Sequence, residues 1–297
     1  MTEIERRAQG WTLFATVLVS TSFPVVGMIA HGLDSSVMAF LRFSLAATLF
    51  GPLVAWRVGL PMPSLKDLGR YATVSAFMVG FFWAMFESLR YTSPLNTATI
   101  FTLTPLIAAV VSAFLLKERL KKRSMAALAL ALVGAIWVIY RGNFSDLLGM
   151  AWNKGDTIFL LGTCSMALYG PLVKFLHRGE PMARMSFWVL TTGAFWMLLI
   201  AFPNLQVTPW SEVPLNIYLG IGYLAVFTTV ITFFIFHWSS TIVGPTKVLS
   251  YTYLNPPLVL VIGLILGDAA PPVLTYPGLV LVMGAMVVLQ ITAPKTT

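Results

Sequence analysis

Residues 93–105 read SPLNTATIFTLTP, and residues 244–256, which lie 151 positions later, read GPTKVLSYTYLNP. In both stretches the second and the last residue are proline, the seventh is a small hydroxyl residue and the eleventh is leucine. Prolines that recur at one spacing are hard to obtain by chance. The two stretches therefore indicate an internal repeat.

The similarity continues on both sides when shifts of one to four residues are allowed. The further pairs are Leu115 with Leu266, Glu118 with Asp268, Gly134 with Gly284, Ala135 with Ala285, Pro24 with Pro171, Gly32 with Gly179 and Phe40 with Phe187. Because these residues keep their order along the chain, we expect two homologous halves, residues 1–142 and 143–297.

The composition places both halves in a membrane. Of the 297 residues, 58% are hydrophobic and 10% are charged, and the mean hydropathy is +0.83. A soluble domain has roughly a quarter charged residues, so the composition excludes a water-soluble enzyme. The single cysteine, Cys164, excludes an intramolecular disulfide and a cysteine-based metal cluster.

Ten apolar runs approach the roughly 20 residues that a membrane-spanning helix needs. They cover residues 11–30, 37–56, 71–89, 95–116, 125–140, 155–175, 186–202, 217–237, 245–266 and 276–291. Each half therefore holds five spans. Because five is an odd number, the second half enters the membrane from the opposite face. The predicted fold class is an all-α integral membrane protein with ten transmembrane helices in two inverted five-helix repeats.

The basic residues orient these spans. With the N-terminus inside, 15 of the 19 lysines and arginines lie on the inner side, three lie outside, and Arg42 lies within a span. Lysine and arginine concentrate on cytoplasmic loops. We therefore expect both termini in the cytoplasm and the protein in the inner (plasma) membrane. This distribution explains the net charge of +8 without a nucleic acid partner.

Inverted repeats are typical of secondary transporters, whose substrate site lies near the midplane between the halves. No Walker A motif or catalytic constellation is visible in the sequence, which favours transport without ATP. Two alternatives stay open. The duplication could serve packing alone, or the chain could be a membrane receptor or a membrane-embedded enzyme with polar residues converging at one level.

The residues also resemble a known family. Residues 91–140, with TPLIAAVVSAFLLKERL followed by ALVGA, are similar to the EamA family of the drug/metabolite transporter superfamily. So are the LRF tripeptide that contains Arg42 and the ordered motifs VGPT, NPPL and LGD. The resemblance covers nearly the whole chain, but Lys117-Glu118 stands where the family has Gly-Glu. It implies ten helices, cytoplasmic termini, and a cavity lined mainly by helices 1, 3, 4, 6, 8 and 9. It also implies export, with aromatic amino acid exporters of the YddG type as the preferred comparison.

The expected cavity residues combine aromatic rings with small polar groups, which suits a ligand with an apolar body and a few polar atoms. Several of them recur at helical spacing on one face of a span. The alternative is packing against lipid or neighbouring helices. The expected residues are Gly80, Trp83, Glu87, Thr97, Phe101, Thr104, Tyr169, Tyr223, Phe227, Ser250, Tyr251 and Asn255.

Two ionisable residues within the spans are further candidates, because charges in a bilayer are expensive and are often functional. Arg42 and Glu87 both fall in the outer third of their spans. They could gate the outer mouth or clamp a zwitterion. The favoured interpretation is that they neutralise each other and hold two helices together.

Prolines inside spans delete a backbone hydrogen bond and bend the helix. We expect them to interrupt equivalent helices of the two halves. Hinges and static kinks that shape a cavity are equally consistent with their positions. The residues concerned are Pro24, Pro105, Gly170, Pro171 and Pro256.

These patterns predict a transporter of small neutral or zwitterionic metabolites, with amino acids bearing aromatic or other apolar side chains as the preferred cargo. No cofactor and no metal site are expected, since the three histidines are scattered. The expected partners are the lipid bilayer and a small-molecule substrate. Drugs and sugar phosphates are alternative cargoes, and the oligomeric state and the mode of coupling stay open.

Overall fold

The computed structural model of the chain describes residues 2–117, 122–143, 152–243 and 245–292. Within this part all regular structure is helical, and no strand occurs. Seven helical segments are long and apolar enough to cross a membrane, and two shorter apolar helices accompany them. The predicted fold class of ten transmembrane helices in two inverted repeats is confirmed. The predicted departure from the family pattern at Glu118 lies outside the described residues.

The first half contains α1 Glu3–Ile29, α2 Ser35–Val58, α3 Leu65–Ser88, α4 Pro94–Phe101, α5 Thr104–Leu115 and α6 Lys122–Ile139. The second half contains α8 Lys154–Leu176, α9 Met182–Val207, η1 Trp210–Glu212, α10 Leu215–Ala225, the π-helical η2 Val226–Ile231, α11 Thr232–Val243, α12 Pro245–Ser250, η3 Tyr251–Leu254, α13 Asn255–Leu266, η4 Val273–Thr275 and α14 Tyr276–Thr292.

Capping residues decide where several of these helices begin. Side chains of Thr2, Asp34, Ser64, Ser93 and Asn153 each accept a hydrogen bond from a backbone N–H of the first turn. These N–H groups have no partner within the helix itself, so a capping oxygen favours a start at that residue. Because capping extends α1 and α3 beyond the apolar runs, both helices begin before their predicted spans.

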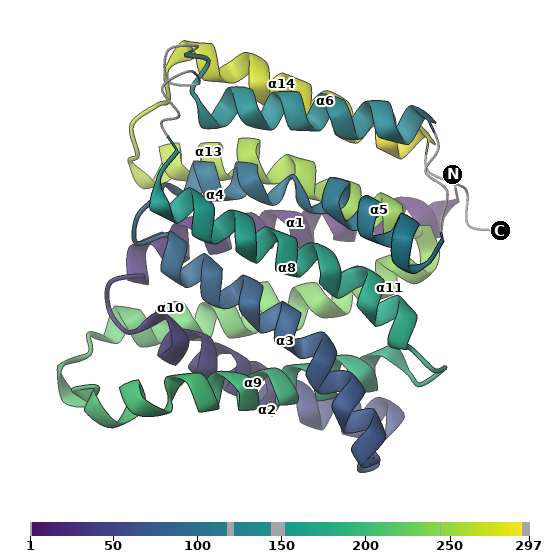
Figure 1. Ribbon diagram of the computed structural model, residues 1–297, viewed down its shortest axis with the longest axis vertical. Helices are drawn as coiled ribbons and strands as arrows, with labels where there is room; N and C mark the ends of the chain where they lie inside the picture. The colour runs from purple at the N-terminus through teal and green to yellow at the C-terminus, as the bar shows by residue number, and fades with distance from the viewer. Residues whose placement is uncertain (1, 118–121, 144–151, 244, 293–297) are drawn as a thin grey trace.

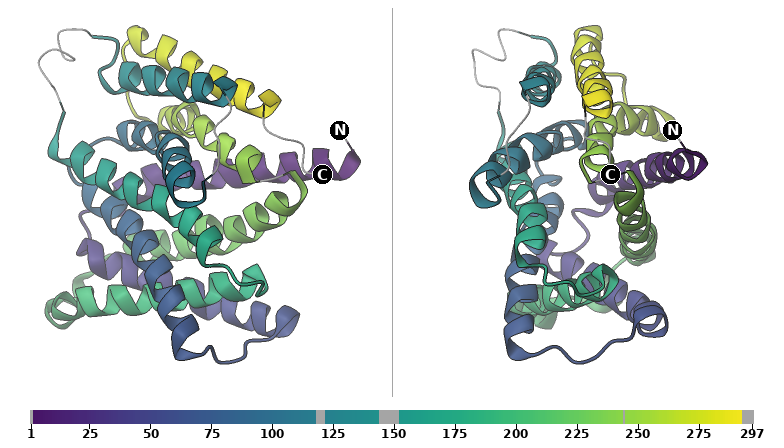
Figure 2. Two further views of the ribbon diagram at one scale, coloured as in Figure 1. Left: turned by 45° about the vertical axis from the view of Figure 1, so that its right-hand side comes forward. Right: turned by 90° about the vertical axis from the view of Figure 1, so that its right-hand side faces the viewer.

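Equivalent helices of the two halves pack on each other. The pairs α2 with α9, α6 with α14 and α4 with α13 are in contact, and α3 with α8 is matched by α11 with α1. In Figure 1 the α6–α14 pair lies at the top and the α2–α9 pair near the bottom. Figure 2 shows from two further directions that α6 and α14 form one end of the molecule. This exchange of partners is the pattern expected from two halves related by a two-fold axis.

The repeated proline stretches form interrupted helices. The fourth span breaks between α4 and α5, and the ninth changes to a 3₁₀ turn, η3, between α12 and α13. The breaks are equivalent in the repeat, and each is followed by a proline in the first turn of the next helix, Pro105 and Pro256. A proline there needs no backbone donor of its own. The matched prolines therefore mark two matched interruptions.

The expectation for the other two prolines is corrected. Pro24 and Pro171 are buried within α1 and α8, which continue through them without interruption. A proline inside a membrane helix is tolerated where neighbouring helices support the segment. Any hinge role of Pro24, Gly170 and Pro171 therefore has to act by bending a continuous helix.

Candidate functional site

Four phenyl rings meet between helices of the two halves. Phe101, an expected cavity residue on α4, lies 6.0 Å from Phe23 of α1 and 5.1 Å from Phe81 of α3, measured between ring centroids. Phe159 of α8 lies 6.3 Å from Phe23 and 5.6 Å from Phe81. None of the four side chains is more than 7% exposed. We call these four residues the phenyl cluster.

Polar groups lie one helical turn before Phe23 on α1. Ser20 donates a hydrogen bond of 2.9 Å to Oδ1 of Asn255, at the start of α13. The hydroxyl groups of Thr21 and Tyr223 share a hydrogen bond of 2.7 Å, which joins α1 to α10. The Tyr223 ring stacks on Phe227 at 5.1 Å. Two expected cavity residues, Tyr223 and Asn255, thus contact α1 within one turn of Phe23, with Asn255 on the side of Ser20 and Tyr223 on the side of Thr21.

The Arg42 side chain is 1% exposed and does not pair with Glu87, so the favoured interpretation of a neutralising pair is corrected. Its Nε and Nη2 groups donate to the hydroxyl oxygens of Thr229 and Thr228, at 3.1 and 3.0 Å. Its guanidinium lies 4.3 Å above the ring of Phe82. The two charges are separated because Arg42 turns inward between α3 and η2.

Glu87 lies near the end of α3 with partners of its own. Its carboxylate accepts hydrogen bonds from Ser35, at 2.8 Å, and from Tyr91, at 3.3 Å, and lies 3.6 Å from Nη1 of Arg90. These contacts tie the end of α3 to the start of α2. The carboxylate of Glu87, which the sequence suggested as a gating residue, is therefore stabilised by neighbours at the ends of α3 and α2.

The other expected cavity residues occupy different surroundings. Gly80 serves the packing of α3 on α8, because a Cβ atom there would lie 2.9 Å from Oγ of Ser165. Trp83 and Phe227 are 38% and 42% exposed. The remaining residues are buried or half-buried: Thr97, Thr104, Tyr169, Ser250 and Tyr251.

The prediction from sequence missed several residues of this centre: Ser20, Thr21, Phe23, Phe81, Phe82, Phe159, Thr228 and Thr229. One signal was available, since the STSF sequence directly before Pro24 is the most polar stretch within the first span. For the phenylalanines no signal distinguished inward rings from lipid-facing ones.

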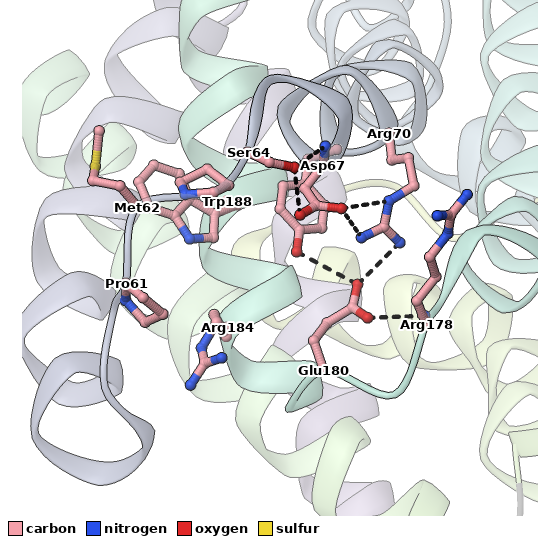
Figure 3. A pocket seen from close by; sticks show the side chains of 11 residues that line it. Pro61, Met62, Ser64, Asp67, Arg70, Arg178, Glu180, Arg184 and Trp188 are labelled. Atoms are coloured by element: carbon pink, nitrogen blue, oxygen red, sulfur yellow. Dashed lines mark hydrogen bonds and ion pairs between the residues drawn. The ribbon is translucent and has the colours of Figure 1, made fainter.

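A separate cavity of about 300 Å³ lies where α2 and α8 end and α3 and α9 begin (Figure 3). Its lining residues are Pro61, Met62, Pro63, Ser64, Asp67, Arg70, Tyr71, Arg178, Glu180, Arg184 and Trp188. It lies apart from the phenyl cluster, and the sequence-based prediction did not include it.

Arg70 is the centre of the charged network in this cavity (Figure 3). It bonds Asp67 within α3, the backbone oxygen of Leu176, and Glu180 at 3.4 Å. Tyr71 also donates to Glu180, at 3.4 Å. Because α3 belongs to the first half and Glu180 to the second, this network joins the two halves at one end of the helices.

Glu180 lies in the loop before α9, and its side chain is 12% exposed. Its partial burial raises the pKa of the carboxyl group, but the backbone N–H groups of Glu180 and Arg178 and the charge of Arg70 lower it more. The net pKa of Glu180 is below its ordinary value of 4.5. The folded state therefore favours the ionised carboxylate.

We expect Glu180→Gln to reduce the free energy of unfolding at pH 7 by about 1 kcal/mol, because it removes an ion pair that is partly screened by solvent. A carboxyl whose pKa falls on folding stabilises the protein above its unfolded pKa and loses this contribution as the pH falls. The difference in the free energy of unfolding between the native protein and Glu180→Gln should therefore become smaller as the pH falls below 4.5. Thermal unfolding in detergent at pH 7 and pH 4 measures it, with Glu212→Gln in η1 as control. An advantage that is equal at both pH values would contradict the prediction.

Among the described residues, no group of three or more histidine, cysteine, aspartate or glutamate side chains could hold a metal ion. Polar contacts at the centre come instead from hydroxyl, amide and guanidinium groups. Such groups bind organic ligands by hydrogen bonds and ion pairs.

Comparison with known proteins shows which family this architecture is similar to. The profile of the EamA-like transporter family matches residues 6–140 and residues 153–291. The uncharacterized transporter YyaM of Bacillus subtilis (strain 168) is 26% identical over 235 residues, which are 78% of this chain and 77% of that protein. The uncharacterized inner membrane transporter YedA of Escherichia coli (strain K12) is 24% identical over 259 residues, 86% and 81% of the two chains.

One solved crystal structure shares the fold, with a TM-score of 0.67 at 18% identity over 98% of this chain and 100% of the other. The family profile covers most of the chain, in two matches that follow each other along the sequence. The protein is an integral multi-pass membrane transporter, and it belongs to the EamA-like transporter family.

Proposed function

We propose that the protein is a secondary transporter that exports small zwitterionic or neutral metabolites, with amino acids bearing aromatic or other apolar side chains as its best substrates. The observation that carries this proposal is the phenyl cluster together with the hydrogen-bonding groups of Ser20 and Asn255, which lie one turn before Phe23 on α1. Such a combination suits a ligand with one apolar end and one polar end.

The aromatic part of the substrate is assigned to the level of the phenyl cluster. Aromatic rings favour edge-to-face contacts with other rings, beyond the effect of burying apolar surface. The four rings are in contact with each other, so a substrate can enter between them only if they move apart. Substrate binding would therefore be coupled to movement of the helices that carry the rings, α1, α3, α4 and α8. The amide and hydroxyl groups one turn away offer hydrogen bonds to its polar end.

Movement is assigned to the two inverted halves, residues 1–142 and 143–297. The matched interruptions near Pro105 and Pro256 give each half one broken helix, and broken helices commonly flank transport sites. Exchange of the two conformations would open the site to either side in turn. Both termini are assigned to the cytoplasm from the distribution of lysine and arginine.

Other cargoes are less compatible with this centre. Sugar phosphates need several basic side chains at the site, and Arg42 is the one basic residue that the described part of the chain shows in contact with a ring adjoining the phenyl cluster. Apolar drugs would also fit aromatic rings, but they carry no group that needs the buried guanidinium of Arg42. Amino acid export of the YddG type, carried over from the sequence resemblance, therefore stays the preferred function, ahead of a receptor or an enzyme.

Transport by the purified protein in liposomes tests the proposal. We expect labelled phenylalanine to exchange across the membrane faster than through protein-free liposomes, and Phe101→Ala to slow this exchange at least about fivefold because a ring of the cluster is lost. Phe114→Ala is the matched control, since Phe114 lies on the same span but is exposed. Movement of a quaternary ammonium dye without any movement of amino acids would contradict the proposal.

A further inference from the structure

Arg42 carries a positive charge that the described residues do not neutralise. Guanidinium groups stay protonated in proteins, and charges within membrane spans are normally paired or face a polar path. None of the ion pairs formed within the described residues includes Arg42. The two threonines that contact it supply hydroxyl dipoles, and the Phe82 ring supplies the negative face of its quadrupole, but none of the three carries an opposite charge.

The two threonines hold the guanidinium in a defined orientation. Thr228 and Thr229 both donate their hydroxyl hydrogens to the carbonyl oxygen of Leu224, at 2.9 and 3.0 Å, which leaves their oxygen lone pairs for Arg42. The hydroxyl of Thr229 reaches back five residues for this bond, whereas a threonine in a regular α-helix bonds the carbonyl three or four residues before it. The π-helical turn of η2 permits it, and π turns of this kind occur frequently at functional sites.

The contacts with the two threonines leave three N–H hydrogens of the Arg42 guanidinium, on Nη1 and Nη2, without a hydrogen-bond partner among the described residues. Arginine has five N–H hydrogens, and the contacts with the threonines use one on Nε and one on Nη2. Nη1 is buried and has no hydrogen-bond partner among the described residues. Nη1 and Nη2 together present the two parallel donors that match the two oxygens of a carboxylate.

The guanidinium of Arg42 lies one aromatic ring away from the centre assigned to the substrate. Phe82, beneath the guanidinium, has its ring 5.0 Å from that of Phe81, which belongs to the phenyl cluster. A carboxylate held by Arg42 would therefore leave an attached aromatic side chain within reach of the cluster. An amino acid has this arrangement of an anionic group and an apolar ring.

We propose that Arg42 binds the carboxylate of the transported substrate and selects acids over the corresponding amines. This inference rests on the proposed function, because it assigns a specificity residue to the same centre. Thr228 and Thr229 are positioning residues that hold the guanidinium for this contact. Without substrate, the described residues stabilise the charge through two threonine hydroxyls and the face of the Phe82 ring, so binding a carboxylate gains a full ion pair in a medium of low dielectric constant.

Three probes separate the groups of the substrate: phenylalanine, phenethylamine, which lacks the carboxylate, and 3-phenylpropionate, which lacks the ammonium group. In detergent we expect phenylalanine and 3-phenylpropionate to raise the melting temperature of the native protein and phenethylamine to leave it unchanged. In liposomes, once the movement through protein-free liposomes has been subtracted, we expect phenylalanine to move at least about tenfold faster than phenethylamine, which corresponds to about 1.4 kcal/mol.

Arg42→Gln should abolish this preference, so that phenylalanine slows at least about tenfold while phenethylamine does not. Arg42→Lys should restore part of it, because a lysine keeps the charge without the paired donors. Arg57→Gln is the matched control, since Arg57 lies on the same helix but at its other end, over Trp56. This control should keep the preference for phenylalanine.

The outcomes distinguish the inference from the proposed function. If the native protein and Arg42→Gln move phenylalanine and phenethylamine in the same ratio, Arg42 is structural and the inference fails while amino acid transport stands. If no amino acid moves but 3-phenylpropionate still stabilises the native protein and not Arg42→Gln, the inference stands and the proposed substrate fails. If none of the probes stabilises the native protein, the carboxylate assignment is overturned.

Discussion

Gly134→Ala should reduce the free energy of unfolding by about 2–3 kcal/mol. Gly134 lies where α6 packs against α14, and a Cβ atom there would lie 2.8 Å from the carbonyl oxygen of Gly278 and 2.9 Å from Cγ2 of Val282. Backbone oxygens cannot move aside as side chains do, so the two helices have to separate. Helices in a bilayer associate mainly through close packing of small residues, and this pair would lose that packing.

Gly284→Ala is the matched control, because Gly284 is the counterpart of Gly134 in the repeat. A Cβ atom at Gly284 would meet only Cδ2 of Leu130, at 3.7 Å, which is an ordinary contact. Alanine is favoured over glycine within helices, so this variant should be neutral or more stable by up to about 1 kcal/mol. Thermal unfolding of both variants in the same detergent measures the difference. Equal melting temperatures for the two would show that α6 and α14 do not approach as described.

Asp156→Ala is expected to cost about 3 kcal/mol of folding stability. The Asp156 side chain is fully buried, and its carboxylate accepts hydrogen bonds from Thr92 at 2.6 Å, from Asn96 at 3.4 Å and from the backbone of Asn153 at 3.3 Å. Hydrogen bonds to a charged acceptor are stronger than neutral ones. Its removal would leave the half-buried donors of Thr92 and Asn96 without this partner and would weaken the start of α8.

Glu5→Ala is the control for this prediction. Glu5 occupies the same third position of a capping box, at the start of α1, but its hydrogen bond with Thr2 is exposed. We therefore expect Glu5→Ala to cost no more than about 1 kcal/mol. Unfolding of both variants followed by circular dichroism measures the two costs. If they were equal, capping alone would explain Asp156, and the link it makes between the halves would contribute nothing.

Local features of the sequence were sufficient for the fold class. A helix crosses a bilayer because its own residues are apolar over enough length, and basic residues orient it because they stay in the cytoplasm. The repeated prolines predicted two equivalent interruptions, which the structure places next to Pro105 and Pro256. At Pro24 and Pro171 the same reasoning failed, because packing in the core keeps those helices continuous.

The candidate site was only partly predictable. Three residues that were expected in the cavity do contact α1: Phe101, Tyr223 and Asn255. Three residues of the phenyl cluster were not expected: Phe23, Phe81 and Phe159. In a span that is apolar all round, hydrophobic periodicity does not distinguish the inner face from the lipid face. Asp156 was overlooked among the acidic residues, although Asn153 three positions before it is a sequence signal for a helix start.

The sequence by itself determined that the chain spans the membrane ten times, in two halves of opposite orientation, because apolar length, basic loops and repeated prolines act through each segment separately. Only the tertiary structure decided which charges and rings meet. The sequence favoured an ion pair between Arg42 and Glu87. In the structure Arg42 instead donates hydrogen bonds to two threonines of η2, and Glu87 contacts Ser35 and Arg90. The energy of a charge depends on atoms within a few ångströms, and helix packing brings those atoms from distant parts of the chain.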